Sequence, residues 1–129
     1  PIGTYRRWFD VPDGFGRAVL RCDGIDSTGE VTIDGVHLGW TKGSRLTHEF
    51  PVALTPGRHE IVVRVAQFSA TSYVEDQDMV RLSGIFRDIA VVARPDGGID
   101  DCVVMADYDP ITGRGSLDVP IGGALCRWW

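Results

Sequence analysis

The stretch Val31-Thr32-Ile33-Asp34-Gly35-Val36-His37-Leu38 carries the clearest structural signal in the chain. Val31 and Ile33 alternate with polar neighbours, which is typical of a strand with one buried face. The pair Asp34-Gly35 is a two-residue signal for the tight turn of a β-hairpin. The apolar residues after this pair continue as a second strand. The stretch therefore predicts two antiparallel strands joined by a tight turn.

The same alternation recurs on both sides of this hairpin. It predicts further strands over residues 3–11, 18–22, 61–66 and 89–93, with turn clusters between them. Apolar residues on both sides of the strands 61–66 and 89–93 predict central strands that are covered on each face. No window keeps apolar residues at a helical period for three turns, since glycine or proline interrupts each one. We therefore predict an all-β fold, a jelly-roll-like β-sandwich.

Composition and charge limit the function classes. The chain has 129 residues, of which 43% are hydrophobic, so it is long enough to bury a core. Its formal net charge is −5, and no stretch gathers enough Lys or Arg to neutralise a phosphate backbone. No apolar run is long enough to cross a bilayer. We expect neither a nucleic-acid partner nor a membrane partner.

The three cysteines are Cys22, Cys102 and Cys126, an odd number without a Cys-x-x-Cys pair. We expect free thiols in a reducing compartment, and hence a cytoplasmic protein. The chain begins at Pro1 without a methionine and ends at Trp129. We expect it to be part of a longer protein.

A proline and two glycines at residues 95–98 predict a domain boundary. We expect one domain over residues 1–95, and a linker with the start of a second domain over residues 96–129. The second part carries two predicted strands, 101–108 and 116–119, on either side of a turn at 109–113. Two strands and a tail cannot bury a core alone. We expect this part to lean on the first domain or on another copy, or to be partly disordered.

The least generic segment spans residues 69–88 and holds Glu75, Asp76 and Asp78 within four positions. In an extended backbone Asp76 and Asp78 point to one side and Glu75 to the other. Such close charges repel unless Arg81, Arg87, a hard cation or a sugar hydroxyl lies between them. Carboxylates bind both hydroxyls and hard cations. The residues by themselves leave open whether this is a ligand-binding loop or a solvated acidic loop with arginine partners.

Two aromatic residues, Tyr73 and Phe86, flank the acidic segment. They are suited to stacking on a sugar face, although isolated aromatic residues more often belong to a core. We expect Trp8 and Trp40 to be core or inter-domain packing residues. The widely spaced His37, His48 and His59 are not arranged as metal ligands, and surface or strand-edge positions are predicted for them.

Residues 72–79 (SYVEDQDM) and 82–88 (LSGIFRD) closely resemble the signature in the sugar-binding domain of family two glycoside hydrolases of the β-galactosidase type. Shorter matches follow in the same order, among them residues 23–27 (DGIDS) and 43–46 (GSRL). The resemblance covers about residues 1–101. Residues 97–101 resemble the passage into the immunoglobulin-like domain that follows in this family.

The resemblance implies a jelly-roll domain packed against a catalytic (β/α) barrel, in a retaining enzyme that hydrolyses terminal β-D-galactosides. The family's catalytic glutamates and magnesium ligands lie on that barrel, so this chain is expected to hold no catalytic residue and to be inactive alone. The second Asp of the Glu-Asp-Gln-Asp run is here Asp78. The resemblance gives it the role of binding the galactosyl hydroxyls and ligating sodium in the intact enzyme.

The sequence departs from the family at Val80, where an aromatic residue is usual, and at Ala70-Thr71, where the family has Asp-Gly. The family's earliest strands lie upstream of Pro1, so we expect an exposed sheet edge and a possible homo-oligomer. Two alternatives to a β-galactosidase domain stay open. One is a free-standing carbohydrate-binding module that uses the acidic loop with Tyr73 or Trp40. The other is a structural sandwich domain for subunit contacts.

Overall fold

The computed structural model describes residues 1–13, 15–75, 78, 80, 82–94, 98–99, 101–121 and 124–128, without the side chains of 121 and 124–128. The chain divides into two compact units, Pro1–Pro95 and Asp96–Trp129. Among the residues just given, all regular elements are strands apart from one short 3₁₀ helix, and every strand pair is antiparallel. The predicted all-β fold class is confirmed within the described part of the chain.

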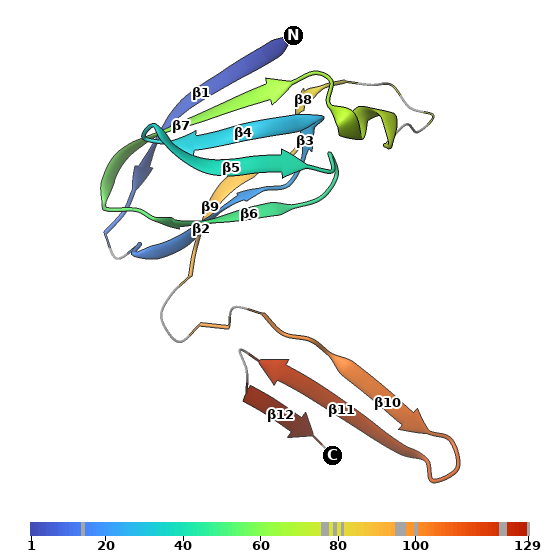
Figure 1. Ribbon diagram of the computed structural model, residues 1–129. Helices are drawn as coiled ribbons and strands as arrows, with labels where there is room; N and C mark the ends of the chain where they lie inside the picture. Colours follow the sequence, from blue (N-terminus) through green and yellow to red (C-terminus); the bar gives the residue numbers. More distant parts are fainter. Residues whose placement is uncertain are drawn as a thin grey trace. The chain divides into compact units, whose positions relative to one another are not determined.

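The described residues of the first unit form nine strands and the 3₁₀ helix, and Figure 1 shows their arrangement. They are β1 (Ile2–Val11), β2 (Arg17–Cys22), β3 (Ile25–Asp26), β4 (Thr28–Ile33), β5 (Val36–Lys42), β6 (His48–Ala53), β7 (Gly57–Ala66), η1 (Ala70–Tyr73), β8 (Gly84–Ile85) and β9 (Ile89–Ala93). One sheet has the order β1-β7-β4-β5 and another the order β6-β2-β9. The short strands β3 and β8 pair with each other.

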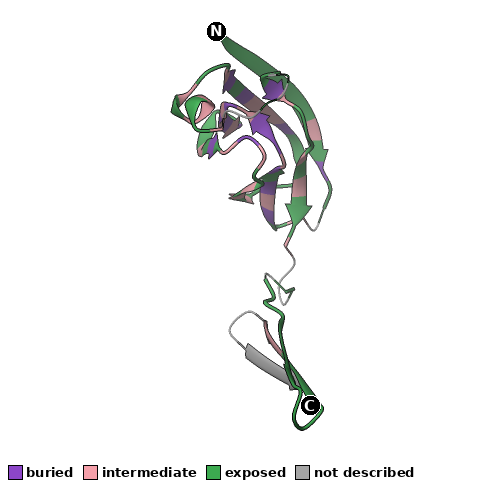
Figure 2. Cartoon of the chain, turned by 90° about the vertical axis from the view of Figure 1, so that its right-hand side faces the viewer, coloured by how far each residue is buried: buried purple, intermediate pink, exposed green. Residues whose placement is uncertain are grey.

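The core lies between the two larger sheets, because each sheet turns one apolar face inward. Leu20 and Cys22 come from β2, while Val31 on β4 and Val63 and Val65 on β7 come from the other sheet. All five side chains are buried in one cluster, and Figure 2 shows the buried positions alternating along the strands. The alternation predicted for residues 18–22, 31–33 and 61–66 is confirmed.

The predicted hairpin at Asp34-Gly35 is also confirmed. β4 and β5 pair across it, and both turn residues have positive φ, 50° for Asp34 and 77° for Gly35. This left-handed pair of conformations matches the right-handed twist of the two strands, and Asp-Gly is one of the few dipeptides that adopts it readily. The Asp34 carboxylate also accepts a hydrogen bond from the backbone N–H of Glu60 at 2.8 Å, so the turn is tied to β7.

Two strands are less covered than predicted. β7 is central, between β1 and β4, but Arg64 on its outer face is exposed. β9 was predicted to be central and instead lies at the end of its sheet beside β2, with Ala90 and Val92 exposed. The two larger sheets of the unit pack against each other, and each does so with one face only. A strand that has apolar residues on both faces therefore buries the side chains of one face and exposes those of the other.

Trp8 and Trp40 are not core residues. Each is about half exposed, at 51% and 53%, because their positions on β1 and β5 point away from the core. The Arg58 guanidinium lies over the Trp8 ring, 5.2 Å from its centroid. The other expectation for these two residues, inter-domain packing, stays a prediction.

His59 was predicted to lie at the surface or a strand edge, and that prediction is wrong. It is buried on β7, whereas His37 and His48 lie on the end strands β5 and β6. The His59 Nδ1 atom is 2.6 Å from an Asp34 carboxylate oxygen and the Nε2 atom is 2.7 Å from the Thr55 carbonyl oxygen. Both partners only accept, so both ring nitrogens must donate and the imidazole is held in its charged form.

The pKa values of this pair follow from the same contacts. The hydrogen bond to Asp34, and then that to the Thr55 carbonyl, raise the pKa of His59. The backbone N–H of Glu60, and then His59, lower the pKa of Asp34. A charge pair between the buried His59 and the exposed Asp34 thus fastens the β4–β5 turn to the neighbouring strand.

Where the second unit is described, it has three strands, β10 (Met105–Asp109), β11 (Arg114–Ile121) and β12 (Ala124–Trp128), in that order in one sheet. The two predicted strands and the turn between them correspond to β10, β11 and residues 110–113. In the turn, Asp109 accepts hydrogen bonds from the backbone N–H of Ile111 at 2.9 Å and the hydroxyl of Thr112 at 2.5 Å. No residue of this unit whose exposure is described is buried, so no core of its own is seen there.

Core burial gives a first prediction, using two valines of the same hairpin. Val31 is fully buried and Val36 is 63% exposed. We expect Val31→Ala to lower the free energy of unfolding by about 2 kcal/mol, because two buried methyl groups are lost and a cavity is left. Val36→Ala should change it by less than about 0.5 kcal/mol. Urea denaturation of both variants measures the difference, and equal losses would contradict the assignment of the core.

The His59–Asp34 pair gives a second prediction, on pH. Because the pKa of His59 is raised in the folded state, its contribution is complete below the unfolded value of about 6.5 and is lost as pH rises through the raised value. Asp34 has a lowered pKa, so its contribution is present above about pH 4 and is lost as pH falls through that lowered value.

Unfolding free energy should therefore fall as pH rises above about 6.5, and His59→Gln should remove most of this slope. His37→Gln, at an exposed position of β5, should leave the slope in place. Urea denaturation at a series of pH values checks both. A His59→Gln protein with the original slope would refute the charged pair.

Candidate functional site

The candidate site is built where the chain leaves β7 and returns to β8. A cluster of hydroxyl residues shapes the start of this connection. The backbone N–H of Ser69 donates to Ser72 Oγ at 3.0 Å, and the hydroxyls of Ser69 and Thr71 lie 2.7 Å apart. The backbone N–H groups of Val74 and Glu75 both donate to the Thr71 carbonyl. Short polar side chains of this kind stabilise turns of the backbone, which here gives η1.

Glu75 anchors the acidic segment to the loop between β5 and β6. Its carboxylate accepts the backbone N–H of Ser44 at 3.1 and 3.2 Å, and the Ser44 hydroxyl at 2.7 Å. Ser44 is 2% exposed, so these charge-assisted bonds lie in a sheltered place and are worth more than exposed ones. The preceding residue, Gly43, has φ of +80°, which few side chains would tolerate there.

Glu75 is therefore a structural anchor, which the sequence reasoning did not foresee. A solvated acidic loop does not describe this carboxylate, because it is bonded to a residue 31 positions away. The only hint in the sequence was that Gly43-Ser44-Arg45-Leu46 and the acidic segment occur together in the family pattern.

Asp78 lies three residues further along and is exposed. The expected alternation of Asp76 and Asp78 and the expected partner Arg81 cannot be followed, because Asp76, Gln77 and Arg81 fall outside the described residues. Arg87 donates to the Arg45 carbonyl at 3.2 Å and lies over the Phe86 ring. Within the acidic segment, Asp78 is therefore a described carboxylate that solvent can reach.

The flanking aromatic residues differ from each other. Tyr73 is 84% exposed and is not a core residue. Phe86 is less exposed and packs over Gly24, where an added Cβ would lie 2.7 Å from the ring. Of the two, only Tyr73 offers most of its ring to an incoming ligand.

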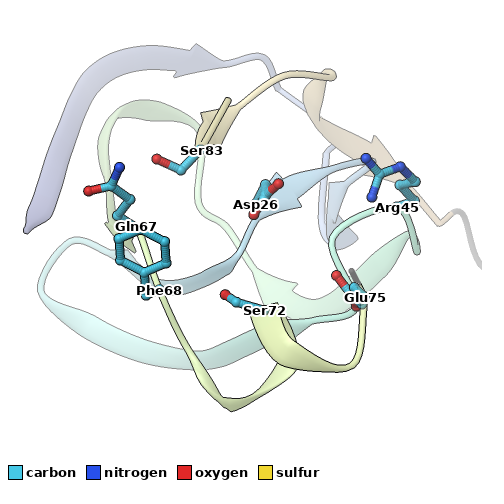
Figure 3. Close-up of a pocket in the computed structure, with 7 residues that line it drawn as sticks. All are labelled: Asp26, Arg45, Gln67, Phe68, Ser72, Glu75 and Ser83. Carbon is cyan, nitrogen blue, oxygen red and sulfur yellow. The ribbon is translucent and has the colours of Figure 1, made fainter. Parts of the chain in front are cut away.

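A pocket of about 150 Å³ lies beside the anchored segment, and Figure 3 shows its lining residues. They come from five places in the first unit: Asp26 on β3, Arg45 after β5, Gln67 and Phe68 after β7, Ser72 and Glu75 at η1, and Ser83 before β8. The lining combines carboxylate, guanidinium, amide and hydroxyl groups with one aromatic ring. Sequence reasoning missed this pocket, since its residues are spread over 58 positions.

A second polar hollow lies near the ends of β2 and β9. It is lined by Arg21, Asp23, Thr47, Arg87 and Asp88. The hydrogen bond from Arg21 Nε at 2.7 Å lowers the pKa of Asp23, whose carboxylate also accepts from the Thr47 hydroxyl. The backbone N–H of Asp23 donates to the Asp88 carbonyl at 2.9 Å. Asp23 thus links the end of β2 to the loop that carries Thr47 and to the segment before β9. Its carboxylate is bound by Arg21 and Thr47 within the fold.

Metal ligands do not gather in the described part of the chain. No group of three or more His, Cys, Asp or Glu side chains lies close enough together there to hold a metal ion. Asp78 fits a hard cation as a single oxygen ligand, but a sodium site needs several oxygen atoms. The remaining ligands would have to come from residues outside this group or from other polypeptide.

The fold and this site define an all-β domain that presents a polar pocket and an acidic loop from one end of its strands. Residues 1–95 match the family model described as "Glycosyl hydrolases family 2, sugar binding domain". The chain belongs to this family.

The curated relatives agree with this assignment. A β-galactosidase of Arthrobacter sp. strain B7 is 47% identical over 124 residues, which cover 91% of this chain and 12% of the relative. A β-galactosidase of Enterobacter cloacae is 37% identical over 131 residues, covering 96% of this chain and 13% of the relative. The chain thus spans about one eighth of the length of these relatives.

Solved structures share the fold at low sequence identity. A β-glucuronidase from an uncultured Clostridium species has a TM-score of 0.76 and 24% identity, over 92% of this chain and 23% of its own. A β-galacturonidase from Eisenbergiella tayi has a TM-score of 0.75 and 18% identity, over 93% and 21%. Within the described residues, no helix has the length and apolar character to span a membrane.

The anchor gives a third prediction. Removing the carboxylate with Glu75→Ala should release η1 from the β5–β6 loop and speed amide hydrogen exchange of residues 70–75 by about tenfold or more, since hydrogen bonds to a charged group are lost. The matched control is Glu49→Ala, because Glu49 pairs with Arg94 on a more exposed surface. Exchange measured by mass spectrometry checks this. Equal exchange in the Glu75→Ala protein and the parent would mean that Glu75 does not hold the segment.

Proposed function

We propose that this chain is the sugar-binding domain of a retaining β-galactosidase, with a jelly-roll-like first domain over residues 1–95. Residues 96–129 are then the linker and the first strands of an immunoglobulin-like domain. The identity of 47% and 37% to proteins named β-galactosidase supports the choice of substrate. The observation that carries the proposal is the anchoring of the acidic segment by Glu75, which leaves Asp78 exposed beyond it.

In this proposal Asp78 contacts the hydroxyls of the terminal galactosyl unit and is one ligand of a sodium ion. An ionised carboxylate accepts hydrogen bonds from two neighbouring hydroxyls and binds hard cations through oxygen. It would orient the sugar ring and would not transfer a proton, which is a positioning role. The anchor matters for this role, because a carboxylate on an untethered loop would have to be ordered at a cost in binding free energy.

The chemical step belongs to other polypeptide in this proposal. Retaining hydrolysis uses two carboxyl groups about 5 Å apart across the sugar. The proposal places both groups, with the magnesium ligands, on a catalytic barrel of the same longer chain. That barrel and the immunoglobulin-like domain are the proposed partners, together with β-galactosides and further copies of the protein. A cytoplasmic location is part of the same proposal and rests on the expected free thiols.

A chimera tests the proposal and gives the fourth prediction. The matching segment of the Arthrobacter β-galactosidase is replaced by this chain, and hydrolysis of o-nitrophenyl β-D-galactoside is followed. We expect an active chimera, in which Asp78→Asn lowers kcat/KM by about 100-fold because the sugar is no longer correctly positioned. The same change should weaken the activation by sodium.

Asp10→Asn is the control, because Asp10 is an exposed aspartate on β1 and should leave both quantities unchanged. A chimera that folds and turns over equally well with Asp78→Asn, with the same sodium response, would refute the role of Asp78. It would favour a purely structural function of the domain.

A further inference from the structure

We propose that the pocket beside the acidic segment binds a single pyranose ring on this domain itself, with the Asp26 carboxylate as its main hydrogen-bond acceptor and Phe68 as its apolar wall. This site is separate from the contact proposed for Asp78, which is not among the residues lining the pocket.

The proposal rests on Asp26, because its carboxylate makes no contact that would stabilise the described part of the fold. It is partly buried on β3, and in the described part of the chain no hydrogen bond or ion pair reaches its side chain. The other carboxylate of the same pocket, that of Glu75, by contrast accepts hydrogen bonds from the Ser44 backbone N–H and hydroxyl. A sheltered carboxylate without partners is costly unless a ligand or water supplies donors.

The rest of the lining supplies what a sugar ring needs. Gln67, Ser72 and Ser83 bring groups that both donate and accept, as sugar hydroxyls do. Ser72 Oγ accepts the Ser69 N–H, so its own hydroxyl hydrogen stays available to a ligand. Phe68 is 60% exposed and offers an apolar face for the C–H side of the ring. Figure 3 shows Asp26 between Phe68 and Arg45, which lie on opposite sides.

Other ligand classes fit this lining less well. A metal ion would need at least three ligating side chains together, and none of the described residues form such a group. A phosphate or other anion would meet the carboxylates of Asp26 and Glu75. A purely apolar molecule would leave Asp26 desolvated without a donor. A neutral sugar ring satisfies the acceptor, the donors and the aromatic face together, because it combines hydroxyl groups with a rigid C–H face.

The size of the pocket limits the ligand to one ring. A cavity of roughly 150 Å³ holds a molecule the size of benzene, and the pocket beside η1 has about this volume. A pyranose has about twice as many heavy atoms as benzene, so one sugar ring can enter only with its outer hydroxyls in solvent, and a second ring would lie outside the pocket. For a ligand of this size we expect a dissociation constant on the order of 1 mM.

The experiment uses the 129-residue chain itself and follows its backbone amide resonances during titration with methyl β-D-galactopyranoside. We expect saturable shifts at residues lining the pocket. Asp26→Asn should weaken binding by about tenfold, because hydrogen bonds to a charged acceptor are lost. Phe68→Ala is the second variant, and its exposed position makes it safe for folding. It should weaken binding by a similar factor.

Two controls separate this site from the proposed function. Asp78→Asn should leave the affinity of the isolated chain unchanged, whereas it impairs the chimera. Sorbitol, an open-chain polyol, should give no saturable shift. The proposal is overturned if the folded chain shows no saturable binding, if sorbitol binds equally well, or if Asp26→Asn and Phe68→Ala both bind like the parent. None of these results would bear on the test of Asp78 in the chimera.

Discussion

One-sided burial of two antiparallel sheets is the constraint on which the first unit depends. Strands β2, β4 and β7 each place every second residue in a common apolar layer, so Leu20, Val31 and Val63 meet although they are far apart in the chain. The other side of each strand is left to face outward. This explains why Arg64 is exposed between the buried Val63 and Val65. It also explains why Trp40 is exposed next to the buried Thr41.

The site is an addition to this frame that polar contacts hold in place. The larger apolar side chains described in the connection from β7 to β8, such as Phe68, Val74 and Leu82, are exposed. The contacts that shape this connection are instead the hydrogen bonds of hydroxyl groups at η1 and the Glu75–Ser44 bonds. These bonds link the acidic segment to the β5–β6 loop, which also supplies Arg45 to the pocket. The result is a polar pocket whose two sides belong to different parts of the chain.

Parts of the architecture were predictable because their causes are local. The hairpin at Asp34-Gly35 follows from two residues that accept positive φ, and the core faces follow from alternation within single strands. Other features could not be predicted. The end position of β9 depends on which strand lies beside it, and β12 carries no signal that distinguishes it from a tail. His59 reads as a polar residue near a turn, and its burial depends on Asp34, 25 positions earlier.

For the candidate site the division is similar. The residue pattern alone determined the fold class, the family and the identity of the acidic segment, because these rest on alternation, turn residues and a contiguous motif. Only the tertiary structure decided that Glu75 is an anchor, that Asp78 is exposed, and that Asp26 faces a pocket with Phe68. The physical reason is that the sequence alone does not distinguish a carboxylate that anchors a loop from one that faces solvent or a pocket. Its role depends on whether a donor such as the Ser44 N–H lies within hydrogen-bond distance, and that is set by long-range packing.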